Sequence, residues 1–237
     1  MINVLINKFG SVIAISLIGL LFGYSGSVFA GTVDNDAIEN KAIDTKAIDK
    51  APRFTELLTA INTLSGEFTQ VIRDPDGAEI QTTSGSFFLK RPGYFYWHIS
   101  PPYEQLVVGT PNSLRIYDPD LEQLTVHSND SLTGSPALLL SGDTAAIDAQ
   151  YAIVATNTEN MQRYTLRQHS DDQGSFESLT FVFVLASGNR VLSEMNFVDK
   201  LGQSTHITLA KVKINPPIND VQFDFEPPSG TDIILEG

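Results

Sequence analysis

Hydrophobic and polar positions alternate along most of the chain after Gly66, in short runs separated by turn residues. The runs read "EFTQVIR", "GSFFLK", "YFYWHI", "QLVV", "SLRIYD", "LEQLTVH", "YAIVAT", "QRYTLRQ", "LTFVFVL", "RVLSEMNFV" and "THITLAKVKI". They are rich in β-branched and aromatic residues, and segments such as "DPDG", "SPP", "TPN" and "DKLG" punctuate them. This pattern predicts roughly ten β-strands joined by tight turns.

Two segments break the alternation and predict helices. In residues 52–64, "PRFTELLTAINTL", the apolar side chains follow the i, i+3, i+4, i+7 spacing of one helix face, and Pro52 suits a first helical turn. The segment "GSPALLLSGD" predicts a short helix around Pro136–Leu140. No β-α-β rhythm occurs, which disfavours a doubly wound fold. The order of elements predicts a mainly β protein with a few helices, in which consecutive hairpins form a strongly curved antiparallel sheet or an unclosed barrel.

The alternation also predicts which side chains share a face of the sheet. In Tyr94–Ile99, the apolar Phe95, Trp97 and Ile99 take one face, and the more polar alternate residues take the other. Inward positions expected on other strands are Phe87, Leu89, Leu106, Val108, Leu114, Ile116, Leu124, Val126, Phe181, Phe183, Leu185, Met195, Phe197, Ile207 and Leu209. Two short helices are too few to cover such a face. The face is therefore either an ordinary core or the lining of a cavity for an apolar ligand.

The N-terminal segment predicts export. Lys8 precedes the uncharged run "SVIAISLIGLLF", which at about twelve residues is shorter than the roughly twenty that a spanning helix needs. Val28 and Ala30 fit the small-residue positions of a cleavage site. We therefore expect residues 1–30 to be a signal peptide, residues 31–51 to be a flexible acidic leader, and residues 52–237 to be one domain.

Composition narrows the classes of function. The chain has 28 Asp and Glu residues and 15 Lys and Arg residues, so its formal charge is −13. This negative charge disfavours binding to nucleic acid and to anionic membrane surfaces. The chain has no cysteine, so disulfides, zinc–thiolate sites, thiol catalysis and a lipid-modified N-terminal cysteine are all excluded. The four histidines lie in separate predicted strands, and the predicted mature chain lacks catalytic, phosphate-binding and metal-binding motifs. We expect no enzyme activity, no cofactor and no metal.

Five segments occur in order over roughly residues 54–232: "GEFTQ", "GSFFLKRPGYFYWHISPPYEQLVV", "LRIYDPDLEQLTV", "SPALLLSGD" and "FDFEPPSGTDI". Together they resemble the LolA family of periplasmic lipoprotein carriers of Gram-negative bacteria. The resemblance implies an unclosed antiparallel β-barrel with a helical lid over an apolar cavity. It also implies that the protein takes lipoproteins from an inner-membrane ABC transporter, LolCDE, and passes them to an outer-membrane receptor, LolB.

The resemblance assigns roles to particular residues. It places Arg91, in the "KRP" motif, as a latch that holds the lid closed, and Pro136, Leu138, Leu139 and Leu140 as the lid segment. From the residues alone, a solvated arginine at a sheet edge is the alternative for Arg91. Phe95 and Trp97 match the family's cavity-lining aromatics. With the alternation, they predict an acyl-chain cavity lined by Phe87, Leu89, Phe95, Trp97, Ile99, Val108, Ile116, Phe181, Phe183, Met195 and Phe197.

Other functions remain open on the sequence. The same fold could serve as a lipoprotein sensor or interaction module, similar to the N-terminal part of RseB. A LolB-like receptor would need the N-terminal cysteine that the chain lacks. The expected partners are lipoproteins through their acyl chains, a LolCDE-type transporter and a LolB-type receptor, and the expected state is a periplasmic monomer.

Overall fold

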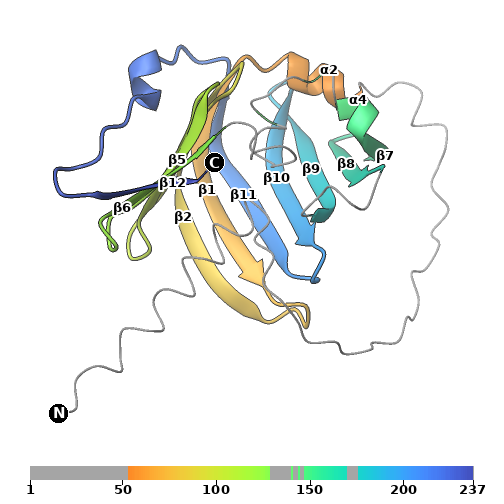
Figure 1. Ribbon diagram of the computed structural model, residues 1–237. Coiled ribbons are helices and arrows are strands. Elements are labelled where there is room, and N and C mark those ends of the chain that lie inside the picture. Colours follow the sequence, from red (N-terminus) through yellow and green to blue (C-terminus); the bar gives the residue numbers. More distant parts are fainter. Residues whose placement is uncertain (1–52, 129–139, 141–143, 145–146, 170–175, 237) are drawn as a thin grey trace.

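One continuous sheet organises the computed structural model, which describes residues 53–128, 140, 144, 147–169 and 176–236 (Figure 1). The helices whose bounds fall within these residues are short: α2 (Phe54–Thr59), α4 (Ile147–Gln150) and the 3₁₀-helix η4 (Asp220–Phe223). The strands are β1 (Thr63–Arg73), β2 (Glu79–Lys90), β3 (Tyr94–Ile99), β4 (Gln105–Gly109), β5 (Ser113–Asp118), β6 (Gln123–Ser128), β7 (Tyr151–Asn157), β8 (Met161–Gln168), β9 (Phe176–Ala186), β10 (Asn189–Asp199), β11 (Ser204–Ile214) and β12 (Asp232–Glu236).

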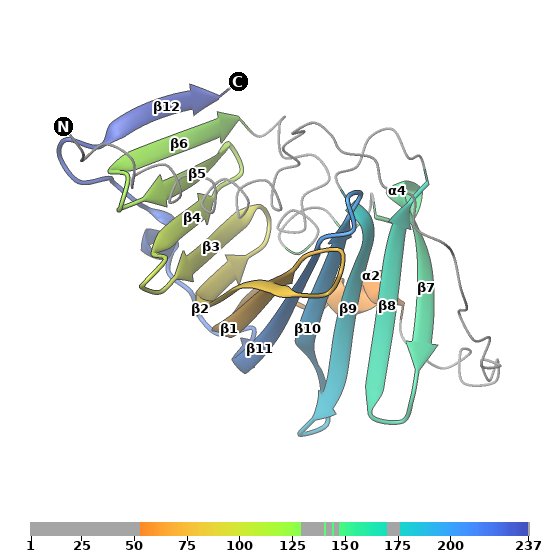
Figure 2. The ribbon, with the colours of Figure 1, turned by 90° about the horizontal axis from the view of Figure 1, so that it is seen from below.

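The sheet consists of two meanders joined side by side. Its order is β12-β6-β5-β4-β3-β2-β1-β11-β10-β9-β8-β7, so the first strand of one meander pairs with the last strand of the other. Viewed from below, the strands follow an arc whose two ends, β12 and β7, do not meet (Figure 2). The predicted fold class, a strongly curved and unclosed antiparallel sheet, is thereby confirmed. The pairing of β12 with β6 is parallel, however, and the sequence did not predict it.

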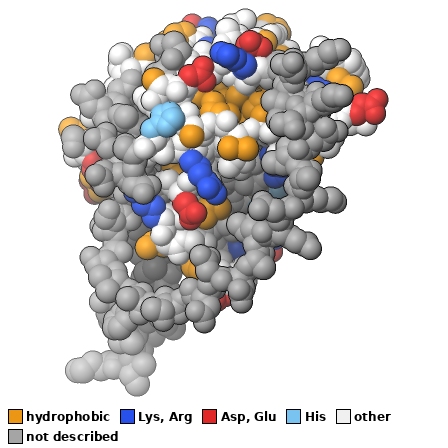
Figure 3. Space-filling view, turned by 90° about the vertical axis from the view of Figure 1, so that its right-hand side faces the viewer, with side chains coloured by type: hydrophobic (Ala, Val, Ile, Leu, Met, Phe, Trp, Pro, Cys, Tyr) orange, Lys and Arg blue, Asp and Glu red, His pale blue; other side chains and the backbone are white. Residues whose placement is uncertain are grey.

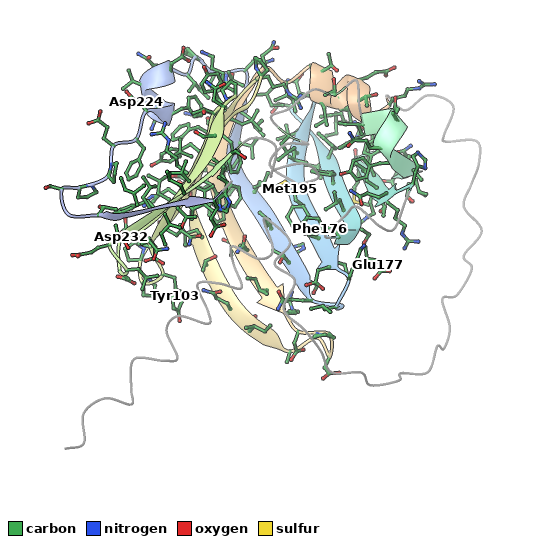
Figure 4. The ribbon with its side chains drawn as sticks, in the orientation of Figure 1. Tyr103, Phe176, Glu177, Met195, Asp224 and Asp232 are labelled. Atoms are coloured by element: carbon green, nitrogen blue, oxygen red, sulfur yellow. The ribbon has the colours of Figure 1, made fainter. Side chains whose placement is uncertain are left out.

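The strand register aligns apolar side chains across the sheet on one face, here called the inner face. One row runs through Phe87, Trp97, Val107 and Ile116 on β2 to β5. In the other meander, a second row runs through Ile207, Met195, Phe181 and Tyr164 on β11 to β8. All these side chains are buried in a single hydrophobic cluster. The adjacent labelled residues Phe176 and Glu177 illustrate the alternation, since Phe176 is buried and Glu177 is exposed (Figure 4).

Glycines opposite aromatic residues let neighbouring strands approach closely on this face. Gly85 pairs with Phe68, and a Cβ atom at Gly85 would lie 1.8 Å from the carbonyl oxygen of His98 and 2.9 Å from the Phe68 ring. Gly66 faces Phe87 in the same way, with the ring 3.0 Å from the position of a Cβ atom. A large ring beside a missing side chain fills the inner face without pushing the strands apart.

Helix α2 is shorter than the sequence predicted. It ends at Thr59, and β1 begins at Thr63, so the apolar Leu64 belongs to the sheet and not to the helix. The reason is tertiary: the side-chain oxygen of Asn215, at the end of β11, accepts hydrogen bonds from the backbone N–H groups of Asn62 and Thr63 at 2.8 and 3.1 Å. These bonds hold the backbone in an extended path where the helical spacing alone would continue the helix.

The C-terminal segment returns across the outer face before it joins the sheet edge. After β11, η4 places Phe223 against Tyr94, with ring centroids 5.3 Å apart, and Asp220 forms an ion pair with Lys90. The Nη1 atom of Arg115 then donates a 2.7 Å hydrogen bond to the carbonyl oxygen of Phe225. The chain finally adds β12 to the edge of the sheet.

Several predictions concern residues outside the described ranges. They are the signal peptide at residues 1–30, the leader at residues 31–51, and Pro136, Leu138 and Leu139 of the predicted lid helix. Leu140 is described: it is helical and buried in the hydrophobic cluster together with Ile147 of α4. Within the described residues, none of the helices has the length and apolar character needed to cross a membrane.

Candidate functional site

The inner face brings together ten of the eleven residues predicted to line an apolar cavity. Each is buried and belongs to the hydrophobic cluster: Phe87, Leu89, Phe95, Trp97, Ile99, Ile116, Phe181, Phe183, Met195 and Phe197. Their shared orientation follows from the two-residue period of strands and from the register of the meanders. The ten side chains thus share one face, and that this face lines a cavity for acyl chains stays a prediction.

Val108 is the exception, and its predicted position on this face is wrong. The register pairs it with Tyr96 and Arg115, whereas its neighbour Val107 pairs with Trp97 and Ile116. Val108 therefore lies on the outer face. Leu106 and Leu124 lie there too, because each of them pairs with Tyr117. The error arises because β4 is buried on both faces, so that "QLVV" offers no polar side to reveal its orientation.

Trp97 is the centre of an aromatic stack on the inner face. Its ring lies nearly parallel to that of Phe68, with centroids 3.7 Å apart and an interplanar angle of 22°. Phe95 and Phe87 flank it at 5.9 and 5.8 Å. Phe68, on β1, was missed as a site residue, although its alternation with Gln70 and Ile72 within "EFTQVIR" was the signal that could have identified it. The stack joins three strands into one wide apolar surface.

A second aromatic group covers the other meander. Phe54 of α2 lies 5.4 Å from Tyr164 and 5.0 Å from Phe181, measured between ring centroids. The sequence placed α2 against an apolar surface without identifying which one, and Tyr164 was not among the predicted site residues. Burial raises the pKa of Tyr164 to about 12, with Arg190 lowering it and Glu56 raising it by smaller amounts. Helix α2 thus caps the inner face over β8 and β9.

Arg91 lies in the turn between β2 and β3, at the margin of the inner face. Its backbone N–H donates a 2.8 Å hydrogen bond to the carbonyl oxygen of Asn62, which ties the turn to the segment that follows α2. The Nε and Nη2 atoms of its guanidinium group are buried. Arg91 as a whole is half-buried, so this burial of two atoms disfavours the alternative of a solvated edge arginine. It leaves the predicted latch as a hypothesis, because the predicted lid residues other than Leu140 lie outside the described ranges.

The charged groups of the described residues do not gather into a chemical centre. No group of three or more His, Asp or Glu among them is placed to hold a metal ion. Basic, acidic and hydrophobic side chains are interspersed among the described residues visible in Figure 3. The buried inner face is therefore the feature of the described structure from which a function can be argued.

Comparison with known proteins identifies the family. Residues 59–226 match the family described as "Outer membrane lipoprotein carrier protein LolA". The chain is 41% identical over 185 residues to an outer-membrane lipoprotein carrier protein of Azotobacter vinelandii, covering 78% of this chain and 87% of that protein. A protein of the same name from Pseudomonas fluorescens is 38% identical over the same shares of both chains. The chain belongs to the LolA family.

Solved structures were also compared. A LolA superfamily protein from Nitrosomonas europaea aligns with 74% of this chain and 99% of its own, at 14% identity and a TM-score of 0.42.

Proposed function

We propose that this protein is a periplasmic carrier that binds the acyl chains of lipoproteins on its inner face. The observation that carries the proposal is the wide apolar surface built around Trp97, Phe68 and Phe181, together with membership of a family whose relatives are named lipoprotein carriers. A carrier, unlike an enzyme, needs no catalytic group. The N-terminal segment, which we propose is a cleaved signal peptide over residues 1–30, supports export to the periplasm.

The energetics of cargo define what such a carrier must do. Each buried methylene contributes about 0.8 kcal/mol, so a tri-acylated anchor exposes an apolar surface that makes free passage through water very unfavourable. We propose that the carrier, as a monomer, receives lipoproteins from a LolCDE-type inner-membrane transporter and delivers them to a LolB-type receptor at the outer membrane. Its acidic surface, with a formal charge of −13 for the whole chain, favours basic docking faces on these partners.

We propose further that Arg91 acts as a latch for a lid that includes Leu140. Two observations support this proposal: Trp97 is only 5% exposed, and Leu140 is buried in the same hydrophobic cluster. Hydrogen bonds from a guanidinium group contribute roughly 1.5–3 kcal/mol each. Acyl chains that displace the lid regain a comparable free energy, so the cargo itself opens the carrier and no other energy source is needed for release.

A transfer assay tests the carrier function. Inner membranes that contain the transporter and a newly made lipoprotein are incubated with the protein, and the membranes are then removed by centrifugation. The carrier is expected to release the lipoprotein as a soluble 1:1 complex. A lipoprotein that stays with the membranes, although the added protein is folded, would contradict the proposal.

The same assay tests the latch. The Arg91→Leu variant is expected to form the soluble complex but to pass less lipoprotein to the receptor, because the closed empty state no longer competes with cargo. Arg167→Leu, which removes an exposed arginine from β8, is the matched control and should transfer normally. Normal transfer by Arg91→Leu would show that Arg91 is not a latch.

A further inference from the structure

The inner face is not uniformly apolar, and its polar minority has an unusual property. Thr83, Gln105 and Thr205 are 6%, 4% and 4% exposed. The Thr83 Oγ1, Gln105 Oε1 and Thr205 Oγ1 atoms are buried, and none has a hydrogen-bond partner in the part of the chain that the structure describes. A buried polar atom without a partner destabilises a fold by roughly 1–3 kcal/mol, so three of them on β4, β2 and β11 of one face require a reason.

The register of the sheet places these residues on the same face, along a line of strands from β4 to β11. Thr83 pairs with Gln70, which is also buried, and Gln70 pairs with Ile207, two residues beyond Thr205. Gln105 pairs with Ile99, which in turn pairs with Gly85, two residues beyond Thr83. Gln70, Thr83, Gln105 and Thr205, here called the polar band, therefore cross β4, β2, β1 and β11 at adjacent levels of the inner face.

The polar band occupies one end of the strands. Gln105 begins β4 and Thr205 is the second residue of β11, while Thr83 and Gln70 lie close to the turn between β1 and β2. The band is thus next to the turns at residues 74–78, 100–104 and 200–203, at the margin of the inner face. The aromatic stack lies one level further in, because Phe68 precedes Gln70 by two residues on the same face.

The chemistry of the band indicates the group that it suits. It offers two hydroxyl groups, which donate or accept a hydrogen bond, and an amide oxygen, which accepts one. It carries no charge of its own, so it gives no counter-ion to a carboxylate or a phosphate. A hydrocarbon chain would leave all three atoms without partners, whereas neutral ester and amide groups provide carbonyl acceptors for the hydroxyls and an N–H donor for Gln105.

We propose that the polar band binds the neutral ester and amide groups that join acyl chains to the first residue of a bound lipoprotein. This inference rests on the proposed carrier function and adds a position for the cargo. The linkage groups lie at the end of the strands, the chains run inward along the Trp97 stack, and the protein part of the cargo remains outside. Bound cargo gives these atoms the hydrogen-bond partners that the described residues do not provide, which makes the band selective for acylated protein over plain hydrocarbon.

The experiment compares two synthetic lipopeptides of equal chain length. One carries ester-linked and amide-linked acyl chains, and the other carries ether-linked alkyl chains without carbonyl groups. Affinity is measured by calorimetry for the native protein and for the double variant Thr83→Val/Thr205→Val. The native protein is expected to bind the ester lipopeptide about tenfold more tightly, since two neutral hydrogen bonds account for roughly that factor. The double variant should lose this preference and bind the ether lipopeptide as the native protein does.

Controls separate the possible failures. Thr69→Val, at an exposed position of β1, is the matched substitution on the outer face and should keep the preference. Thermal unfolding should show that the double variant is as stable as the native protein or more stable; if it fails to fold, Gln105→Met on β4 replaces it, with the same expected loss of preference. An unchanged preference in a folded variant, or equal losses for both lipopeptides, would overturn the role of the band. A native protein that binds neither lipopeptide would instead overturn the carrier function itself.

Discussion

Pairs of glycine and phenylalanine on adjacent strands are the smallest features that shape the inner face. Gly85 opposes Phe68, Gly66 opposes Phe87, and Gly109 opposes Phe95. At Gly85 the neighbouring backbone approaches so closely that no other side chain fits, whereas the space at Gly109 is wider, with Phe95 Cβ at 3.3 Å from the position of an added Cβ atom. The consequences of adding one methyl group therefore differ between positions that look alike in the sequence.

We predict that Gly85→Ala lowers the free energy of unfolding by at least about 3 kcal/mol, because the new Cβ atom would lie 1.8 Å from the His98 carbonyl oxygen and force β2 and β3 apart. Gly109→Ala should change it by less than about 1 kcal/mol, since the contact is tight but allows adjustment. Urea unfolding followed by Trp97 fluorescence measures both. Equal effects of the two substitutions would contradict the close approach at Gly85.

Tyr164 gives stability a dependence on alkaline pH. Its pKa is about 12 in the folded protein, against an ordinary value of about 10, so the unfolded chain releases the phenol proton first. The contribution is constant below about pH 10 and is lost as the pH rises towards 12. Between pH 8 and pH 11 the loss from this residue is about 1.4 kcal/mol. The free energy of unfolding of the Tyr164→Phe variant, measured by urea unfolding, should fall by that much less over the same pH range. If the free energies of both proteins fell equally with pH, the prediction would be wrong.

At the scale of elements, α2 depends on contacts from distant parts of the chain. Six residues are too few for a stable isolated helix, so its position rests on Phe54 within the aromatic group and on Asn215 at its C-terminal end. Asn215 has a positive φ of 55°, and its side chain bonds to Asn62, Thr63 and the Ala60 carbonyl oxygen. One residue at the end of β11 therefore fixes both the end of the helix and the start of β1.

We predict that Asn215→Ala destabilises the protein by roughly 2–4 kcal/mol, because it removes three hydrogen bonds and places alanine in a left-handed conformation. Asn215→Gly keeps the favourable backbone and removes only the side-chain bonds, so it should be intermediate in effect. Lys211→Ala, also at positive φ, is the control on the surface, where it removes only an exposed ion pair with Glu67. Differential scanning calorimetry measures all three, and an Asn215→Ala effect no larger than that of Lys211→Ala would contradict the role of the side chain.

For the whole molecule, the important property is that the two meanders share one apolar surface without closing into a barrel. The pairing of β1 with β11 makes the inner face continuous, and the separated edges β12 and β7 leave the arc open. A closed barrel of the same strands would have a fixed interior. Under the proposed function, an arc whose inner face is covered in part by short helices exchanges that cover for acyl chains.

Trp97 is the only tryptophan in the chain and reports on this exchange. We predict that binding of a tri-acylated lipopeptide changes the intensity or the wavelength of its emission, because the chains contact the ring or alter its stacking on Phe68. Phe68→Leu should retain binding but show a different emission change, since the stacking partner is replaced by an aliphatic side chain. An unchanged spectrum, with binding shown by calorimetry, would place Trp97 outside the site.

The local pattern of apolar and polar residues was sufficient to predict side-chain orientation wherever a strand had one polar and one apolar side. The alternation in "YFYWHI" predicted the orientation of Phe95, Trp97 and Ile99, and helical spacing predicted the apolar face of α2. It failed where burial is two-sided, as for Val108, and where a distant residue decides a boundary, as Asn215 does at Thr63. It also missed β12, whose residues are exposed and whose position depends on pairing with β6.

The strand content, the curved antiparallel class and most of the apolar inner face could be predicted from the sequence, because they follow from side-chain periodicity within each segment. The three-dimensional structure was needed to show which strands join the two meanders, which face Val108 occupies, and how Phe68 stacks on Trp97 across Gly85. It alone also placed Thr83, Gln105 and Thr205 on one face of the sheet. These relations connect residues far apart in the chain, and register between strands, rather than the local pattern, determines them.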